Sequence, residues 1–481
     1  MDSIYISAAH KSSGKTIVSI GLSRIFSNLK YNIQTFKKGP DYIDMSWLSL
    51  ASRRGCYNLD FNTQKKIEIN NFYNEKKSEI NIIEGNKGLY DGLSIDGSDD
   101  NSAMSILLNT GIILVVDTEG ITRGIAPLLQ GYINFEKKCK IKGVILNKVK
   151  TERHENKLIN SVENYTDLKI LGSIRKNKDL HISERHLGLV PANEKKAAEN
   201  KINLISDIIS ESINKKEFKR IGVCLEEKKL HVVSSNSRSW PYYKRKIINA
   251  YKIVLKNEEK IQEIKAKTKI KLGIFRDQSF GFYYTDDIEN FEKFGVDIVY
   301  IDSTKDKKLP AIDALFIGGG FPEINAKRIE KNKTLMKDVK SFIELGNPCY
   351  AECGGLMYLS KSIKYKNKKY TMSGVLSGEI VISDKPIGRG YVNLKIKKNH
   401  PWKIKNKNNI NAHEFHHAEL ILRENKKNKY AYDINRGYGI NGVSDGLTYK
   451  NLLANFSHLR HTKKYPWIKY FINFIEDKKN D

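Results

Sequence analysis

Short apolar runs alternate with segments of helical periodicity over the first 195 residues. Residues 4–8, 80–83 and 143–146 are apolar runs of strand length, and residues 17–26 carry the apolar stripe of an amphipathic helix. Strands that alternate with helices in this way are typical of a parallel sheet that is covered on both faces. We therefore predict an α/β domain over residues 1–195.

The pattern weakens between residues 196 and 269, where lysine is frequent and the periodicity is less regular. We interpret this stretch as the end of the first domain and a linker. A new strand-like run at 271–275 predicts a second α/β domain over residues 270–465, and we interpret residues 466–481 as a C-terminal tail. The predicted fold class is α/β, with two domains that are each a mostly parallel sheet with helices on both faces.

A glycine-lysine-threonine loop follows the first predicted strand. Residues 9–16 read Ala-His-Lys-Ser-Ser-Gly-Lys-Thr and precede the amphipathic helix, which is the context that a phosphate-binding loop requires. The N–H groups of such a loop bind phosphate oxygens, its lysine reaches the terminal phosphates, and its hydroxyl holds Mg²⁺. Ala9 replaces the first glycine of the general pattern. The residues predicted to bind ATP are Ser12, Ser13, Gly14, Lys15 and Thr16, and Thr16 is also predicted to bind Mg²⁺.

Three later segments carry polar side chains where predicted strands end. Asp41 and Asp44 lie in the turn after the second predicted strand, a position from which they would hold Mg²⁺ or orient an acidic substrate. A simple polar turn explains one aspartate more easily than the whole string at 36–44. Glu84 ends an apolar strand, as a carboxylate associated with a metal does in such folds. Asn147 ends another, and its amide is predicted to hydrogen-bond an adenine ring.

Cys353 lies where an apolar strand is expected to turn sharply into a helix. The sequence Ala-Glu-Cys-Gly-Gly over 351–355 would hold the thiol beside backbone N–H groups, as a nucleophile elbow does. A thiolate at this position can attack an amide carbonyl. The glycine turn at 318–320 follows the preceding strand, and its N–H groups are placed to stabilise an oxyanion. We predict an oxyanion hole formed by Gly319, Gly320 and Gly354.

A cysteine nucleophile needs a base, and the candidate is His458, with His461 as the alternative. Residues 453–461 resemble an apolar strand that ends in exposed histidines. The cluster His-Glu-Phe-His-His at 413–417 has a spacing that suggests metal ligation. It lacks the spacing of a zinc protease helix, so we favour a structural or substrate-facing role. We interpret the other cysteines as buried small apolar side chains; these are Cys56, Cys139, Cys224 and Cys349.

Composition narrows the function classes only slightly. The 481 residues suffice for two or three domains, and 83 Lys and Arg against 55 Asp and Glu give a net charge of +28. The lysines are spread along the chain and no recognition module appears, so we predict no nucleic-acid binding. A basic surface does not repel a polycarboxylate substrate. Five scattered cysteines, no signal peptide and no long apolar run predict a cytoplasmic protein that does not enter membranes.

Taken together, these motifs resemble the cobyrinic acid a,c-diamide synthase family, in which a dethiobiotin-synthetase-like ATPase is fused to a glutaminase. The segments that carry the resemblance run in family order over nearly the whole chain: 12–16, 36–44, 84–92, 184–191, 280–284, 318–323, 352–355 and 413–417. The strings at 39–44 and 184–189 distinguish this family from the related cobyric acid synthases. The chain departs from the family pattern at Ala9 and at Arg460, which stands where a second histidine is usual.

The resemblance implies a P-loop NTPase-like synthetase domain over 1–195 and a class I glutamine amidotransferase domain over 270–465. It further implies that glutamine is hydrolysed at Cys353 and that ATP with Mg²⁺ activates carboxylates of a tetrapyrrole as acyl phosphates. Ammonia then amidates the a and c acetates of cobyrinic or hydrogenobyrinic acid, in cobalamin biosynthesis.

Two alternatives remain open at this stage. A nickel-sirohydrochlorin a,c-diamide synthase shares these motifs. A regulatory P-loop ATPase shares the loop, but its signature lysine would fall at His10 and it has no glutaminase domain. The sequence does not specify the metal in the tetrapyrrole, the order of amidation or the oligomeric state, and a homodimer is compatible with it.

Overall fold

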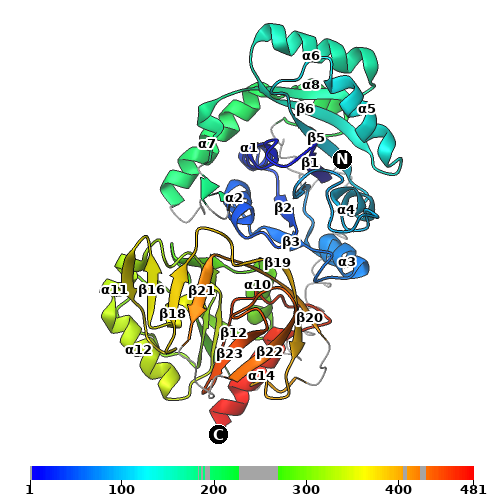
Figure 1. The fold of residues 1–481 in the computed structure, drawn as a ribbon. Helices are drawn as coiled ribbons and strands as arrows, with labels where there is room; N and C mark the ends of the chain where they lie inside the picture. The colour runs from blue at the N-terminus through cyan, green and yellow to red at the C-terminus, as the bar shows by residue number, and fades with distance from the viewer. Residues whose placement is uncertain are drawn as a thin grey trace, which may run out of the picture. The chain divides into compact units, whose positions relative to one another are not determined.

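The computed structural model describes residues 3–182, 195–226, 269–404, 409–422 and 429–480, together with the short strands β8 (Glu184–Arg185) and β9 (Gly188–Leu189). The side chains of residues 183–196 are outside this description, and so is most of the family segment at 184–191. The chain forms two compact units, Met1–Lys228 and Lys229–Asp481 (Figure 1). Each unit is described by itself.

The first unit is built on a seven-stranded parallel sheet with the order β3-β2-β4-β1-β5-β6-β7. Its strands are β1 Ser3–Ala8, β2 Ile33–Lys38, β3 Tyr57–Leu59, β4 Ile80–Glu84, β5 Gly111–Asp117, β6 Ile141–Val149 and β7 Lys169–Arg175. Strands β2 and β4 are buried along their whole length, as expected for a parallel sheet covered on both faces. The predicted α/β architecture of this unit is confirmed.

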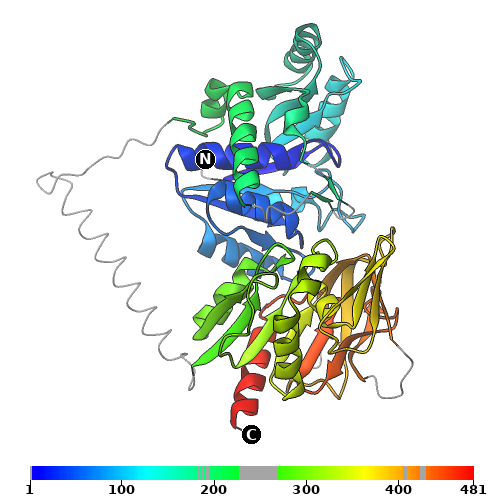
Figure 2. The same ribbon diagram turned by 90° about the vertical axis from the view of Figure 1, so that its left-hand side faces the viewer.

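Helices cover both faces of this sheet (Figure 2). The helices are α1 Lys15–Asn28, α2 Ile43–Ser52, α3 Lys66–Lys76, α4 Asn101–Leu107, α5 Ile125–Phe135, α6 Glu152–Tyr165, α7 Lys195–Ser212 and α8 Lys215–Arg220. Helix α1 packs against α2 and α7, and the apolar side chains of α3 to α6 pack on the other face. Helices α7 and α8 extend the first unit beyond residue 195, and residues 227–268 lie outside the described part of the chain.

A nine-stranded sheet with the order β12-β10-β13-β15-β24-β23-β22-β19-β20 forms the second unit. Its first five strands are parallel: β12 Val296–Ile301, β10 Ile270–Phe275, β13 Ala314–Ile317, β15 Cys349–Glu352 and β24 Leu452–Asn455. The remaining four pair antiparallel: β23 Ser444–Tyr449, β22 Lys429–Arg436, β19 Gly388–Ile396 and β20 Ile410–His416. The α/β class is confirmed, and the antiparallel extension is a feature that the apolar pattern did not predict.

Smaller elements complete the second unit. Two short sheets contain β11 Phe280–Phe282 with β14 Gly319–Gly320, and β16 Ser362–Tyr365, β17 Lys368–Thr371, β18 Glu379–Ile382 and β21 Ala418–Ile421. The helices are α10 Thr285–Lys293, α11 Ala326–Lys331, α12 Lys333–Glu344, α13 Gly354–Leu359 and α14 Trp467–Asn480. Apolar clusters cover both faces of the large sheet. Among the described residues, no helix is long and apolar enough to cross a membrane.

Helix α14 corrects the interpretation of residues 466–481 as a tail. Trp467, Phe471 and Ile475 are buried in the core of the second unit, and the indole N–H of Trp467 donates to Asp287 Oδ2 at 2.9 Å. These apolar side chains are four residues apart and form one face of a helix. The helix is therefore an integral part of this unit.

Candidate active sites

The glycine-lysine-threonine loop connects β1 to α1 and approaches β6 closely. Gly14 has a φ of 98°, and a Cβ atom at this position would lie 2.2 Å from Asn147 Nδ2. The Asn147 amide donates to the carbonyl of Ser13 at 2.8 Å. Glycine is therefore required at position 14 both by its backbone conformation and by the nearby amide. The contact of Asn147 with adenine stays a prediction, and in the structure one N–H of its amide supports the loop.

Lys15 begins α1 and its side chain is buried. Burial, reinforced by the nearby Lys37 ammonium, lowers the pKa of Lys15 to about 8, while Glu84 and Asp44 act in the opposite direction. An anion bound at the loop would favour the ammonium form. The N-terminus of a helix that also carries a lysine is a site suited to phosphate.

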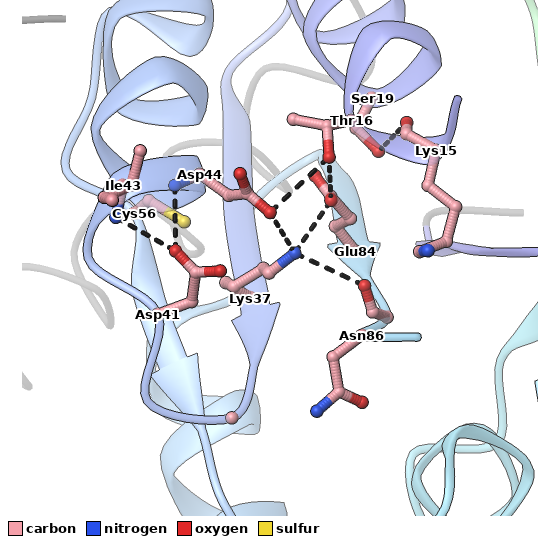
Figure 3. A network of polar contacts seen from close by, with 12 residues as sticks. Lys15, Thr16, Ser19, Lys37, Asp41, Ile43, Asp44, Cys56, Glu84 and Asn86 are labelled. Carbon is pink, nitrogen blue, oxygen red and sulfur yellow. Dashed lines mark hydrogen bonds and ion pairs between the residues drawn. The ribbon is translucent and has the colours of Figure 1, made fainter. Parts of the chain in front are cut away.

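A buried polar network lies beside this loop (Figure 3). The ammonium of Lys37 donates to Asp44 Oδ2 at 2.6 Å and to Glu84 Oε1 at 2.8 Å. The Thr16 hydroxyl donates to the same Glu84 oxygen at 2.7 Å and lies 3.5 Å from Asp44 Oδ2. The predicted metal-associated residues Thr16, Asp44 and Glu84 therefore meet at one point, where α1, α2, β2 and β4 adjoin.

Lys37 was not singled out in the sequence analysis. Burial alone would lower the pKa of Lys37, but the carboxylates of Asp44 and Glu84 raise it well above its ordinary value. Burial also raises the pKa of Glu84, which the ammonium opposes. The signal was a lysine in a strand expected to be covered on both faces, because a buried charge needs a partner.

Asp41 and Asp44, which we predicted as a pair, have different surroundings. Asp41 Oδ1 accepts the N–H groups of Ile43 and Asp44, each at 2.9 Å, at the start of α2. Burial, followed by the charge of Asp44, raises the pKa of Asp41 to about 7. Asp41 therefore stabilises the first turn of a helix, while Asp44 points toward Lys37 and Thr16.

Cys353 occupies a sharp turn between β15 and α13, as predicted. Its φ of 47° and ψ of −101° are unusual for a residue with a side chain, and its N–H donates to Asn455 O at 2.7 Å. Burial and the nearby Glu323 raise the pKa of the thiol, whereas a hydrogen bond from the Gly354 N–H lowers it. A thiol in this environment needs an adjacent base to become a nucleophile.

The three glycines of the predicted oxyanion hole lie close together. A Cβ on Gly354 would lie 2.9 Å from the Gly320 nitrogen, and one on Gly319 would lie 2.5 Å from His458 Cε1. The N–H of the neighbouring Gly318 donates to the Tyr283 hydroxyl at 2.9 Å and supports the turn instead. The glycine turn, the start of α13 and the imidazole of His458 therefore converge within van der Waals distance.

His458 is only 3% exposed, so the expectation of an exposed histidine at a strand end is wrong. Strand β24 ends earlier, and the backbone of His458 instead pairs with that of His413. Its Nδ1 lies 3.3 Å from Glu352 Oε2. Glu352 was also not singled out from the sequence; the only signal was its position directly before the nucleophile.

His461 has a different environment. Its N–H donates to Asp287 Oδ1 at 3.0 Å, and its Nδ1 accepts the N–H of Ile468 in α14 at 3.3 Å. Burial lowers the pKa of His461 to about 4. Its ring contacts Phe294 rather than the glycine turn. These contacts indicate a structural histidine.

The cluster at 413–417 does not gather around one point. The Glu414 carboxylate accepts the N–H groups of Tyr438 and Gly439 at 2.6 and 2.7 Å. His413 Nδ1 is 3.2 Å from the Tyr284 hydroxyl, and the Nδ1 atoms of His416 and His417 face the carbonyls of Ala418 and Ser383. Within the described part of the chain, no three His, Cys, Asp or Glu side chains are grouped to hold a metal ion.

Comparison with known proteins decides the family. Residues 5–190 match the CobQ/CobB/MinD/ParA nucleotide binding domain, and residues 271–465 match the CobB/CobQ-like glutamine amidotransferase domain. The cobyrinate a,c-diamide synthase of Magnetococcus marinus is 33% identical over 99% of this chain and 97% of its own length. The chain belongs to the cobyrinate a,c-diamide synthase family.

Other members of this family are equally similar along their length. The cobyrinate a,c-diamide synthase of Caldanaerobacter subterraneus is 32% identical over 97% of both chains, and that of Picrophilus torridus is 34% identical over 95% of both. The resemblance inferred from the motifs is thereby confirmed, and so is the assignment as an enzyme of the glutamine amidotransferase class with a nucleotide-binding domain. In this member of the family, Cys353 lies in the amidotransferase domain, and the Lys37 network lies in the nucleotide-binding domain.

Proposed function

We propose that this enzyme amidates the a and c acetate side chains of cobyrinic or hydrogenobyrinic acid, with glutamine as nitrogen donor and ATP as activator. The names of relatives that are aligned over nearly their full length support this substrate. The free cysteines are consistent with action in the cytoplasm, where thiols stay reduced. The observation that carries the glutaminase step is the strained turn at Cys353, followed by Gly354, which approaches the same glycine turn that contacts His458.

In the glutaminase step, His458 takes the proton of the Cys353 thiol, and the sulfur attacks the carboxamide carbon of glutamine. The N–H groups of Gly319, Gly320 and Gly354 are the proposed donors to the tetrahedral oxyanion. His458 then gives its proton to the departing nitrogen, and ammonia leaves. Water deprotonated by the same imidazole hydrolyses the thioester to glutamate and restores the thiol.

In the synthetase step, the γ-phosphoryl group of ATP is transferred to a substrate carboxylate, and ADP leaves. Activation is necessary because a carboxylate is a poor electrophile. Lys15 and the loop N–H groups bind the phosphates and offset their repulsion of the substrate anion. Ammonia then attacks the acyl carbon, and inorganic phosphate leaves to give the amide.

The residues beside the loop suit Mg²⁺ as a partner of ATP. Thr16, Asp44 and Glu84 offer only oxygen ligands, which Mg²⁺ prefers. Glu84 Oε2 is buried without a hydrogen-bond partner among the described residues. The ion would neutralise charge on the transferred phosphoryl group.

Turnover of a substrate panel tests this proposal. Purified enzyme with ATP is offered cobyrinic acid, hydrogenobyrinic acid or nickel sirohydrochlorin, with glutamine or ammonium as nitrogen source, and products are identified by mass spectrometry. We expect diamides of the first two acids. Amidation of nickel sirohydrochlorin alone would assign the enzyme to the alternative pathway, and no amidation of any acid would refute the proposal.

Two variants separate the half-reactions. Cys353→Ala should lose synthesis from glutamine but keep synthesis from ammonium, because the thiol acts only in releasing ammonia. Lys15→Ala should lose both, since phosphate binding precedes both. A folded Cys353→Ala enzyme without ammonium-dependent synthesis would contradict this division of labour, and so would a fully active Lys15→Ala enzyme.

A further inference from the structure

We propose that Glu352 is the positioning carboxylate that orients His458 as the base of the glutaminase reaction. This inference rests on the proposed glutaminase step. A cysteine and histidine pair works best when a third group fixes the tautomer and direction of the imidazole. The question is which side chain of this chain does so.

The segment that carries His458 supplies no acid for this role. Two residues further along stands Arg460, a buried cation whose Nη2 lies 3.1 Å from Asp286 Oδ2. Its guanidinium stacks over the Tyr284 ring, 4.9 Å from the ring centroid. Arg460 therefore pairs with α10, and the carboxylate that reaches the imidazole must come from another element.

Glu352 reaches it from the last position of β15, directly before Cys353. Its Oε2 lies 3.3 Å from His458 Nδ1, and both side chains are 3% exposed. Its other oxygen accepts the Tyr350 hydroxyl at 2.5 Å and the N–H of Leu459 at 2.9 Å. The carboxylate is therefore fixed both by its own strand and by the residue that follows the histidine.

This arrangement assigns the two imidazole nitrogens. Nδ1 faces the Glu352 carboxylate, 3.3 Å from Oε2, so we assign the proton to Nδ1 and the lone pair to Nε2 on the opposite edge of the ring. A Cβ on Gly319 would lie 2.5 Å from Cε1 and 3.4 Å from Nε2 of His458. The basic edge of the ring therefore faces the glycine turn, where Gly320 touches the first residue of the Cys353 helix. Substrate chemistry would take place at this edge.

Glu352 and Cys353 are neighbours in sequence, which explains geometrically how Glu352 can orient the base that serves Cys353. Glu352 is the last residue of a strand and Cys353 is the turn, so one backbone segment sets the positions of both the nucleophile and the group that orients its base. The strained φ of Cys353 turns the thiol away from the strand direction, while the preceding side chain remains in the register of the sheet. Nucleophile and orienting acid are thereby held in a fixed relationship.

Several charged or titratable groups surround His458 and the Cys353 thiol. Glu352 from β15 and His413 from β20 are titratable side chains that face His458, and Arg460 acts on His413 from the same segment as His458. Glu323 and Asp445 act on the thiol. Replacing Glu352 removes the negative charge at Nδ1 and leaves all the others in place.

The test compares Glu352→Gln with the wild-type enzyme in glutamate release from glutamine. We expect kcat to fall by about 10²- to 10⁴-fold with little change in the KM for glutamine. Ammonium-dependent synthesis by Glu352→Gln should be unchanged. Glu344→Gln, on the surface of α12, is the control variant.

Glu352→Asp is a second test variant, to be used if Glu352→Gln does not fold. It keeps the charge but withdraws the oxygens by one methylene, so kcat for glutamate release should fall with little change in the KM for glutamine. Wild-type turnover in either variant would overturn the role of Glu352. Failure of wild-type enzyme to release glutamate at all would instead refute the glutaminase step on which the inference rests.

Discussion

The imidazole of His458 lies flat against that of His413, with ring centroids 4.8 Å apart and ring planes 16° apart. Two stacked imidazoles at this distance do not both carry charge in a buried site, because the repulsion adds to the loss of hydration. Burial, then His458, then Arg460 all lower the pKa of His413. His413 is therefore held in its neutral form in this stacked pair.

The first prediction compares the two candidate bases. His458→Ala should lower glutamate release from glutamine by about two to four orders of magnitude, the usual contribution of a positioned general base. His461→Ala should lower it far less, because that side chain contacts Asp287, Ile468 and Phe294. Both should keep ammonium-dependent synthesis. A large loss confined to His461→Ala would reverse the assignment.

The second prediction concerns the close approach of Gly319 to the base. In Gly319→Ala the new methyl group would lie 2.5 Å from His458 Cε1, so the imidazole must move and glutamine turnover should fall by at least about tenfold. Gly131→Ala is the matched control, since a Cβ there meets nothing within 4 Å. Equal glutamate release by the two variants would show that the turn and the imidazole are further apart.

The third prediction concerns Lys37. Lys37→Met leaves Asp44 and Glu84 together without their cation, and removing one partner of a buried ion pair costs about 3–5 kcal/mol. We expect weaker resistance to denaturant in the first unit, partly restored by Mg²⁺ between the two carboxylates. Lys38→Met is the control, because Lys38 contacts the amide of Asn86. Identical denaturation curves for the two variants, with and without Mg²⁺, would count against the network.

The fourth prediction is a pH dependence of stability. Burial lowers the pKa of His400 from 6.5 to about 3, and its Nδ1 accepts the Trp402 N–H at 3.1 Å. As the pH falls, His400 takes up a proton in the unfolded chain before it does so in the folded protein. The contribution of His400 to stability is therefore complete above pH 6.5 and is lost as the pH falls below this value. His400 should contribute a loss of about 1.4 kcal/mol per pH unit.

Denaturation at pH 7 and pH 5 checks this expectation. His400→Gln should be less stable than the wild type at pH 7, because it loses the contact of His400 with the Tyr432 hydroxyl. It should lose less stability on acidification. An unchanged difference between the two pH values would exclude His400 as a source of the acid sensitivity.

Features set by short stretches of chain were predictable. The phosphate-binding loop and the turn at Cys353 are each a strand, a few residues and a helix, so sequence order nearly determines their geometry. The Lys37 network was not predictable, because its partners come from different strands and helices and meet only in the folded sheet. Asp41 and Asp44 were read as a pair, but the first turn of α2 directs their carboxylates to different partners.

The second unit also contains features that the sequence predicts and features that it does not. The periodicity of residues 388–449 does not distinguish parallel from antiparallel pairing, since both bury apolar strands. The lysines near the end of α14 suggested a tail, although Trp467 and Phe471 already had the spacing of a buried helix face. His458 was identified from its type and context, but its partner Glu352 depends on β15 and β24 being neighbours in the sheet.

The central place of β24 in the nine-stranded sheet sets the order in which this polypeptide can fold during synthesis. It is the last strand of the sheet to be made, yet it joins the parallel part to the antiparallel part. Until residues 452–455 leave the ribosome, β15 and β23 each present an open edge that can pair with other chains. The strands described in the nucleotide-binding unit are all made by residue 189, so this unit can fold well before the amidotransferase unit does.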